Sequence, residues 1–284
     1  MDATVPTSAA LFPGQGSHAD GMDDGLRDHP RMAQGLDLLG YDPFPRVAEG
    51  TEFQQPALYL CSVVAWEDSG LDPVAAAGHS LGEYAALVAA GALRFEDGLS
   101  LVALRARAMA DAGRASPGTM LAVLGGDEAA VRALAAELGL TVANDNAPGQ
   151  LVLSGSAGDI DAAEPRVTDD LGARARRLDV SGAFHSPLMA PAAAALERAL
   201  ARVEFDEPRL PVISNGTAAP FRDPHTELVA NLVRPVRWRE SLLALRDLGA
   251  EDFVELGPGR VLSGLVKRTL REEGTSARRA VVSS

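Results

Sequence analysis

The chain has 284 residues, 46% of them hydrophobic and 23% charged, which is typical of a globular protein with one large domain or a large and a small one. Acidic residues outnumber basic ones by 39 to 26, and the net charge of −13 argues against nucleic acid and anionic membranes as partners. The single cysteine, Cys61, excludes an internal disulfide and a cysteine-based zinc site, and no metal site is expected.

The segment before residue 118 predicts alternating strands and helices. It opens without a basic segment followed by an apolar stretch, so no signal peptide is expected, and no apolar run reaches the ~18 residues of a membrane span. A cytoplasmic location is therefore expected.

Strand 9–12 leads into the loop 13–17, where two glycines permit close backbone approach. The other elements expected here are a weak helix at 32–39, helices at 56–66, 81–90 and 96–112, and a strand at 74–77.

Residues 78–82 read Gly-His-Ser-Leu-Gly and lie between the predicted strand 74–77 and the helix that follows it. This is the pattern of a nucleophile elbow, in which glycines on both sides of a serine allow a sharp strand-to-helix turn. The serine hydroxyl is then exposed at the carboxyl edge of a sheet, in front of a helix N-terminus. We predict that Ser80 is a nucleophile; a structural turn serine is the alternative.

From residue 118 the pattern changes to β-α-β-β-α-β, the order of a ferredoxin-like unit. The predicted fold is therefore α/β: an α/β-hydrolase-like core with a mainly parallel sheet from residues 1–117 and 184–284, and an inserted ferredoxin-like α+β subdomain at 118–183. The insert is expected to have strands at 119–124, 141–143, 150–154 and 173–180 and helices at 128–138 and 159–171. After it we expect helices at 192–203, 224–231, 239–247 and 261–273, strands at 210–214 and 252–256, and a loose tail at 274–284.

A serine nucleophile needs a base, and histidine is the usual one near neutral pH. Among five histidines we predict His185, because it precedes a Ser-Pro helix start at the point where the chain returns to the main sheet. His79 is expected to pack or to hydrogen-bond locally, and His18 to line a site. The acid of a hydrolase triad has no clear candidate, which argues against a plain lipase or esterase. The remaining candidates are His29 and His225, expected on the surface, and the acids Asp145, Asp159, Asp161 and Asp179, all within the insert.

Several motifs follow one another along nearly the whole chain. They lie at residues 12–17, 55–58, 78–84, 105, 146–150, 182–189, 235–238 and 255–259. Together they resemble the malonyl-CoA:acyl-carrier-protein transacylases, both stand-alone enzymes and acyltransferase domains of polyketide synthases. Two departures are His18, where the family commonly has glutamine, and a segment from Ser17 to Gln55 that is shorter than usual.

The resemblance implies a Ser-His dyad without a carboxylate. The histidine would be held by a backbone carbonyl, and the matching position is Asn231. The oxyanion donors would be the backbone amides of Gln15 and Leu81. Physical reasoning agrees, because one amide follows the nucleophile at a helix start and the other lies in a glycine-flanked loop.

Arg105 shares a helix face with Leu101 and Met109, and an arginine on an apolar stripe needs an anion. The residues alone leave a substrate anion and a structural ion pair equally open. The resemblance matches Arg105 to the arginine that clamps the free carboxylate of malonyl through two parallel hydrogen bonds. Arg107 is expected on the surface, paired with Asp111.

The function implied is ping-pong transfer of a malonyl group from malonyl-CoA to the phosphopantetheine thiol of an acyl carrier protein, through a malonyl ester of Ser80. No cofactor is expected beyond the phosphopantetheine of that partner. Phe184 and Leu81 fit malonyl-selective members, and methylmalonyl is the alternative acyl unit. An acyl hydrolase of the same fold and a non-catalytic scaffold are the rival functions; a scaffold predicts disrupted catalytic positions, and none is seen.

Docking of an acidic carrier protein to a chain of net negative charge needs a local basic patch. We predict it around Arg260, Lys267 and Arg268, although solvated surface charges are nearly as good an explanation. The sequence leaves open the fatty-acid or polyketide pathway and the oligomeric state, a monomer being one option. Other basic residues considered for this patch are Arg271 in the last helix and Arg174, Arg176 and Arg177 in the insert.

Overall fold

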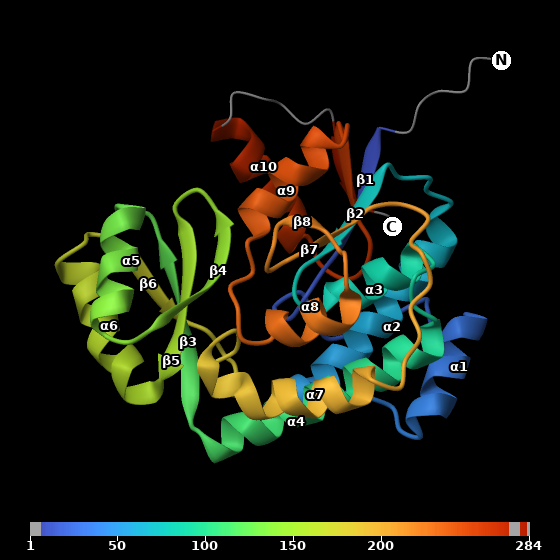
Figure 1. The fold of residues 1–284 in the computed structure, drawn as a ribbon, viewed down its shortest axis with the longest axis horizontal. Helices are drawn as coiled ribbons and strands as arrows, with labels where there is room; N and C mark the ends of the chain where they lie inside the picture. Colours follow the sequence, from blue (N-terminus) through green and yellow to red (C-terminus); the bar gives the residue numbers. More distant parts are fainter. Residues whose placement is uncertain (1–6, 273–278, 283–284) are drawn as a thin grey trace.

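The computed structural model of the protein describes residues 7–272 and 279–282, and it contains two separate sheets (Figure 1). The larger sheet has the strand order β10-β9-β1-β2-β7-β8. Its first five strands pair in parallel, and only the β7–β8 pair is antiparallel. The strands are β1 (Ser8–Phe12), β2 (Ala75–Gly78), β7 (Val212–Ser214), β8 (Ala219–Pro220), β9 (Asp252–Glu255) and β10 (Arg279–Val282).

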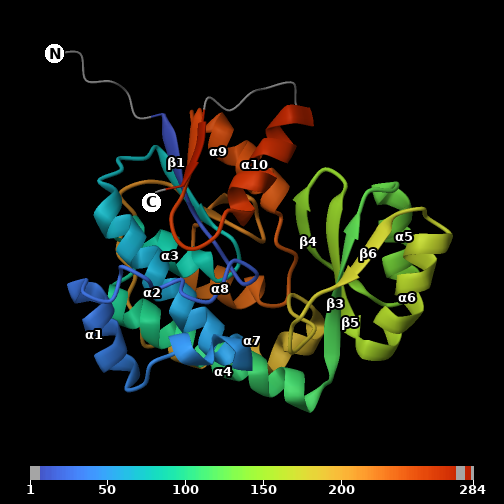
Figure 2. The same cartoon turned by 180° about the vertical axis from the view of Figure 1, so that it is seen from behind.

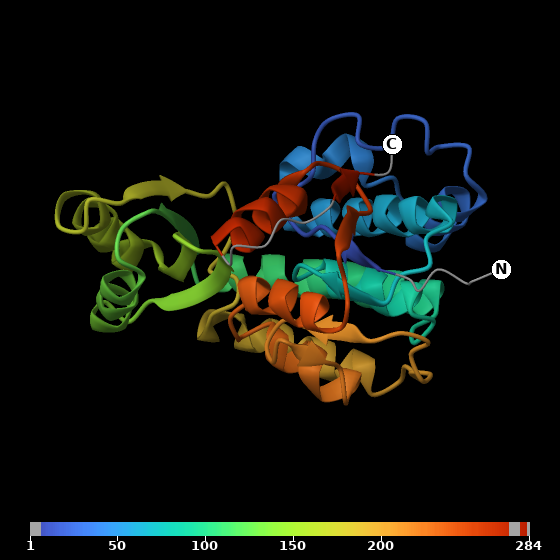
Figure 3. The same cartoon turned by 90° about the horizontal axis from the view of Figure 1, so that it is seen from above.

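Helices cover both faces of this sheet, as a parallel sheet requires. Successive residues of β1 alternate between two cores: Ala10 and Phe12 pack with α2, α3 and α4, whereas Ala9 and Leu11 pack with α9 and α10. From above, the blue α2 and the orange α9 lie on opposite sides of the larger part (Figure 3). The helices of this part are α1 (Pro30–Leu39), η1 (Phe44–Glu49), α2 (Thr51–Ser69), α3 (Gly82–Ala89), α4 (Phe95–Ala115), η2 (Pro187–Met189), α7 (Ala190–Leu200), α8 (Pro224–Asn231), α9 (Trp238–Asp247) and α10 (Val261–Glu272).

The second sheet is fully antiparallel, with the order β4-β5-β3-β6. In chain order its elements run β-α-β-β-α-β, so the ferredoxin-like prediction is confirmed. One face packs on α5 and α6 through residues such as Leu121, Leu153 and Ile160. The opposite face, including Met120 and Val152, joins the core of the larger part. The elements are β3 (Gly118–Leu124), α5 (Glu128–Glu137), β4 (Thr141–Ala147), β5 (Gln150–Ser156), α6 (Ala157–Asp169) and β6 (Arg174–Arg177).

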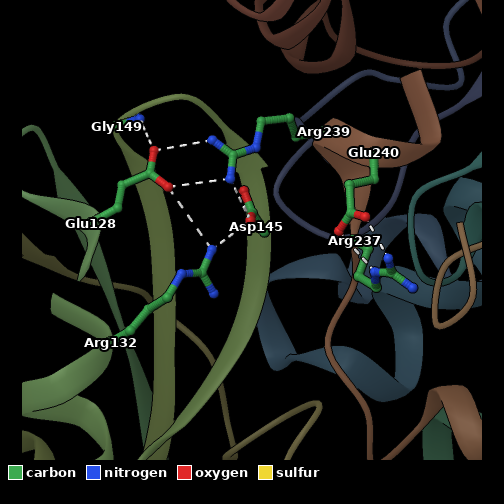
Figure 4. A network of polar contacts seen from close by, with 7 residues as sticks. All are labelled: Glu128, Arg132, Asp145, Gly149, Arg237, Arg239 and Glu240. Atoms are coloured by element: carbon green, nitrogen blue, oxygen red, sulfur yellow. Dashed lines mark hydrogen bonds and ion pairs between the residues drawn. The ribbon is translucent and has the colours of Figure 1, made fainter. Parts of the chain in front are cut away.

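Strand β4 attaches this subdomain to the larger part. It contacts α9 and α10, and the view from behind shows β4 beside α10 (Figure 2). The Asp145 amide donates to the Val236 carbonyl at 2.9 Å, and the Val236 amide donates to the Ala143 carbonyl at 2.8 Å. The Asp145 carboxylate also pairs with Arg132 at 2.5 Å and with Arg239 of α9 at 2.9 Å (Figure 4). The division into domains at 117/118 and 183/184 stays a prediction.

The mixed α/β fold with a mainly parallel sheet is confirmed, but several element boundaries differ from the prediction; β6, for example, ends at Arg177 and not at residue 180. Helix α2 begins at Thr51 and holds Pro56 in its interior, because buried residues of the first turn extend the helix toward Gly50. Strand β4 continues through Asn144-Asp145-Asn146, residue types that are rare in strands, because the backbone of Val236 pairs with it. The expected loose tail is wrong for residues 279–282, which pair with β9 as the edge strand β10; residues 274–278 and 283–284 lie outside the described part.

Across the described residues, no helix is both long and apolar enough to cross a membrane.

Candidate active site

Ser80 stands between β2 and α3 in a sharp turn. Its φ of +53° is in the left-handed region, which is strained for any residue with a side chain. The glycines on either side are required by close packing. A Cβ on Gly78 would lie 1.8 Å from the carbonyl carbon of Gly82, and a Cβ on Gly82 would lie 2.1 Å from the Phe12 oxygen. The elbow predicted from the sequence is therefore present, and β1 packs directly beneath it.

His185 lies beside Ser80, although 105 positions separate them in the chain. The Ser80 Oγ to His185 Nε2 distance is 2.8 Å. On the other side of the ring, Nδ1 lies 2.8 Å from the Asn231 carbonyl and 3.2 Å from the Arg234 carbonyl. Because carbonyl oxygens only accept hydrogen bonds, Nδ1 carries the proton and Nε2 is left free to accept one from the serine.

No carboxylate of the described chain is hydrogen-bonded to His185. Of the four acids considered, Asp145 is held by Arg132 and Arg239, and Asp161 pairs with Arg177. The environment also affects the ring itself: burial, and then the positive charge of Arg105, lower the pKa of His185 to about 3. The imidazole is therefore neutral in the free protein, as a proton acceptor must be.

The loop 13–17 lies against the elbow, since a Cβ on Gly14 would lie 2.4 Å from the His79 carbonyl oxygen, and Gln15 lines the same cavity as Ser80. Its side chain is tied to α2: Gln15 Nε2 donates to Gln54 at 2.8 Å, and Thr51 Oγ1 donates to Gln15 Oε1 at 2.7 Å. Neither the Gln15 amide nor the Leu81 amide donates a hydrogen bond to another residue of the described ranges. Two unengaged amides at the nucleophile fit the predicted oxyanion role, which stays a prediction.

Arg105 lies on α4 and is only 2% exposed. Its Nη2 donates to Ser80 Oγ at 2.8 Å, and its Nη1 donates to Gln55 Oε1. Its Nε is buried and has no hydrogen-bond partner in the described part of the chain. No carboxylate within the described residues forms an ion pair with it. A buried cation without a counterion beside the nucleophile is a site for an anion.

A cavity of about 340 Å³ opens above the Ser80–His185 pair, between the larger part and the subdomain. Phe184, 4% exposed, forms part of its wall. A second cavity of about 210 Å³ lies beside Cys61 and contains neither residue of the pair. Burial raises the pKa of the Cys61 thiol to about 12, so it stays protonated, as expected for a core thiol. The main cavity is also lined by Met109, Met120, Leu178 and Val180 and by the polar residues Gln15, His18, Asn144, Arg176 and Asp179.

One side-chain prediction holds in part and another is wrong. His79 packs, as one of its two expected roles required, with its ring against Trp238, but its hydrogen bond is not local, since Nε2 lies 2.8 Å from Asn146 Oδ1 of the subdomain. The predicted pair of Arg107 with Asp111 is wrong. Asp111 instead pairs with Arg114, which lies three positions further along α4 and is about as exposed as Asp111 itself.

The basic residues considered for docking divide into two groups. Arg260, Lys267 and Arg268 are exposed at or on α10. Arg268 donates to Gln150 of the β4–β5 hairpin at 3.0 Å, and Gly259, next to Arg260, packs against Ser17 beside the cavity loop. In contrast, Arg177 is neutralised by ion pairs with acids of α6. Among the described residues the α10 group forms no ion pair, and its Arg260 end lies next to the loop 13–17.

A strained serine that opens onto a cavity, with a carbonyl-held histidine on one side and a buried arginine hydrogen-bonded to its hydroxyl, defines a serine-dependent acyl-transfer enzyme. Residues 36–283 match the acyl transferase domain family, and the chain belongs to that family.

Known proteins are similar to this chain over most of its length. A malonyl CoA-acyl carrier protein transacylase of Bacillus subtilis is 39% identical, covering 95% of this chain and 92% of the relative. The polyketide biosynthesis protein ThaF of Burkholderia thailandensis is 41% identical over 95% of this chain, which spans only 25% of ThaF. The crystal structure of an acyl carrier protein S-malonyltransferase from Vibrio cholerae superposes with a TM-score of 0.88 at 36% identity, covering 97% of this chain and 96% of that one.

Proposed function

We propose that this enzyme transfers a malonyl group from malonyl-CoA to the phosphopantetheine thiol of an acyl carrier protein. The observation that carries the proposal is Arg105, a buried cation that forms no ion pair with any described residue and lies 2.8 Å from the Ser80 hydroxyl. A malonyl thioester supplies the missing carboxylate at a fixed distance from its reactive carbonyl. The names of the Bacillus subtilis and Vibrio cholerae relatives support the same substrate and partner.

In the first half-reaction, Ser80 Oγ attacks the thioester carbonyl as its proton passes to His185 Nε2. The oxyanion forms at the amides of Gln15 and Leu81, and the carboxylate pairs with Arg105. Collapse of the tetrahedral intermediate breaks the carbon–sulfur bond, and His185 returns the proton to the sulfur of CoA. In the second half-reaction, the carrier thiol attacks the malonyl-serine ester and its proton passes through His185 to Ser80.

The chemistry assigned to these residues needs no cofactor, since the phosphopantetheine arrives on the partner. We propose that Phe184 in the cavity wall and the buried Leu81 limit the size of the acyl group that the site accepts. One additional methyl group in such a pocket is discriminated by roughly 10- to 200-fold. We therefore propose malonyl as the preferred unit, with slower use of methylmalonyl. The cytoplasmic location, the monomeric state and the pathway stay predictions.

Incubation with radiolabelled malonyl-CoA tests the function. We expect about one malonyl group per enzyme, a single burst of CoA, and loss of the label to a holo-carrier protein. The control variant Ser80→Ala should carry no label. Steady release of free malonate without a carrier would favour the hydrolase, and label that persists on Ser80→Ala would contradict the nucleophile. In the same assay, a higher kcat/KM for methylmalonyl-CoA than for malonyl-CoA would contradict the acyl preference.

We also propose that Arg260, Lys267 and Arg268 dock the carrier protein beside the cavity. The double variant Lys267→Glu/Arg268→Glu is expected to raise the KM for the carrier about tenfold or more, through lost charge attraction, while the rate of malonyl-enzyme formation is unchanged. The matched control is Arg198→Glu/Arg202→Glu, at and just after the exposed end of α7. Equal loss of both half-reactions in the α10 variant, or an equal effect of the control, would contradict the docking site.

A further inference from the structure

Glu83, the second residue of α3, is buried and has no part in the mechanism described above. It is 2% exposed. A single carboxyl oxygen, Oε1, accepts two hydrogen bonds: one from the Asn215 backbone amide at 2.7 Å and one from the Asn231 side chain at 2.9 Å. These two donors come from separate segments, the end of β7 and the end of α8. Glu83 therefore joins three segments of the chain at one atom.

The Asn215 side chain holds the nucleophile elbow. Its Oδ1 accepts from the Ser80 backbone amide at 2.6 Å, and its Nδ2 donates to the Gly78 carbonyl at 2.7 Å. These bonds flank the one strained peptide position of the turn, where Ser80 has its positive φ. A strained backbone conformation persists only where several neighbouring contacts hold it in place. The two hydrogen bonds from Asn215 therefore help to fix the position of Ser80.

Asn231 holds the base. Its carbonyl oxygen accepts from His185 Nδ1 at 2.8 Å, and its Nδ2 donates to Glu83 and, at 3.1 Å, to Ser214 Oγ. The side chain thus fixes the end of α8, and the carbonyl of the same residue fixes the imidazole. Asn215, which holds the nucleophile, and Asn231, which holds the base, are thus both hydrogen-bonded to Glu83.

We infer that Glu83 is a positioning residue that sets the placement of Ser80 relative to His185, through Asn215 on one side and Asn231 on the other. The inference rests on the proposed function, and Glu83 touches none of the reacting atoms. A displacement of the order of 1 Å between reacting groups costs about 10²-fold in rate. Loss of the shared acceptor is therefore expected to slow acylation and to leave substrate binding largely intact.

The carboxyl acts here as an acceptor at one oxygen, so an amide can replace it. Burial raises the pKa of Glu83 to about 8, so the group is mostly uncharged near neutral pH. Glutamine has the same length and keeps an acceptor oxygen, whereas alanine removes it and aspartate withdraws it by one methylene group. A purely structural role for Glu83 would change stability in these variants without separating kcat from KM.

The experiment measures malonyl-enzyme formation by rapid quench, at varied malonyl-CoA, together with the thermal unfolding midpoint. Relative to wild type, we expect Glu83→Ala to lower the saturated rate about 100-fold with KM within about threefold, and Glu83→Gln to stay within about threefold in both. If Glu83→Ala does not fold, Glu83→Asp replaces it, with an expected loss of about tenfold. The control Leu245→Ala removes a fully buried side chain of α9, and should lower the unfolding midpoint without slowing acylation.

Three results would overturn the inference: Glu83→Ala or Glu83→Asp acylated at the wild-type rate, Glu83→Gln as slow as Glu83→Ala, or a control slowed as much as Glu83→Ala. Failure of the wild-type protein to form any malonyl-enzyme would instead refute the proposed function, so the two failures are distinguishable.

Discussion

Replacement of His185 by alanine is expected to reduce malonyl-enzyme formation by about 10⁴-fold or more. The imidazole is the only group within the described residues that is hydrogen-bonded to Ser80 Oγ and able to accept its proton, since Arg105 can only donate. The variant should still bind malonyl-CoA, because the arginine and the cavity wall remain. Single-turnover kinetics measure the loss, and His225→Ala, at the exposed start of α8, is the control expected to match wild type.

The pH dependence of the wild-type enzyme tests the role of His185 as the base. A pKa lowered to about 3 means that the free enzyme keeps its base neutral as the pH falls, so kcat/KM should stay flat through pH 6.5 and decline only well below it. The charge of Arg105 contributes to this lowering, and a bound malonyl carboxylate neutralises that charge. The acid limb of kcat should therefore lie at higher pH than that of kcat/KM. An acid limb near 6.5 in kcat/KM, or substantial acylation of His185→Ala, would contradict the assignment.

The sequence predicted the parts of the site that local patterns encode. The elbow glycines, the Ser-Pro turn after His185 and the apolar stripe around Arg105 are each readable within about ten residues. That His185 and Arg105 would meet at Ser80 was predicted from the point where the chain returns to the main sheet and from the family resemblance. The hydrogen bond between His185 and the Asn231 carbonyl is a backbone contact, which residue types alone do not encode; only the resemblance indicated it.

The polar contacts between distant segments were not predictable in this way. Glu83 is part of the elbow motif, yet nothing in the spacing shows that Asn215 and Asn231 converge on its carboxyl oxygen. The contact of His79 with Asn146 was missed because it depends on β4 being drawn against the larger part by Val236 and Arg239. Periodicity shows which face of an element is buried, but it does not show which buried polar groups meet.

Replacement of Arg105 by alanine is expected to change the choice of substrate more than the chemistry. A malonyl carboxylate would then be buried without its partner, at a cost of about 2–5 kcal/mol, or roughly 30- to 4,000-fold in kcat/KM for malonyl-CoA. Acetyl-CoA has no carboxylate and gains nothing from the guanidinium. Its kcat/KM should be unchanged or higher, because the variant no longer buries an unpaired cation.

The malonyl-to-acetyl ratio of kcat/KM is therefore the decisive measurement, and it should fall by about 10²-fold or more in Arg105→Ala. Arg105→Lys is the matched variant: it keeps a positive charge but loses the planar fork, so its ratio should lie between those of alanine and wild type. The same substitution tests the electrostatic coupling in the site, since removal of the charge should move the acid limb of kcat/KM to higher pH as the pKa of His185 rises. An equal fall for both thioesters would show that Arg105 supports the serine, to which it donates at 2.8 Å, and does not select the acyl group.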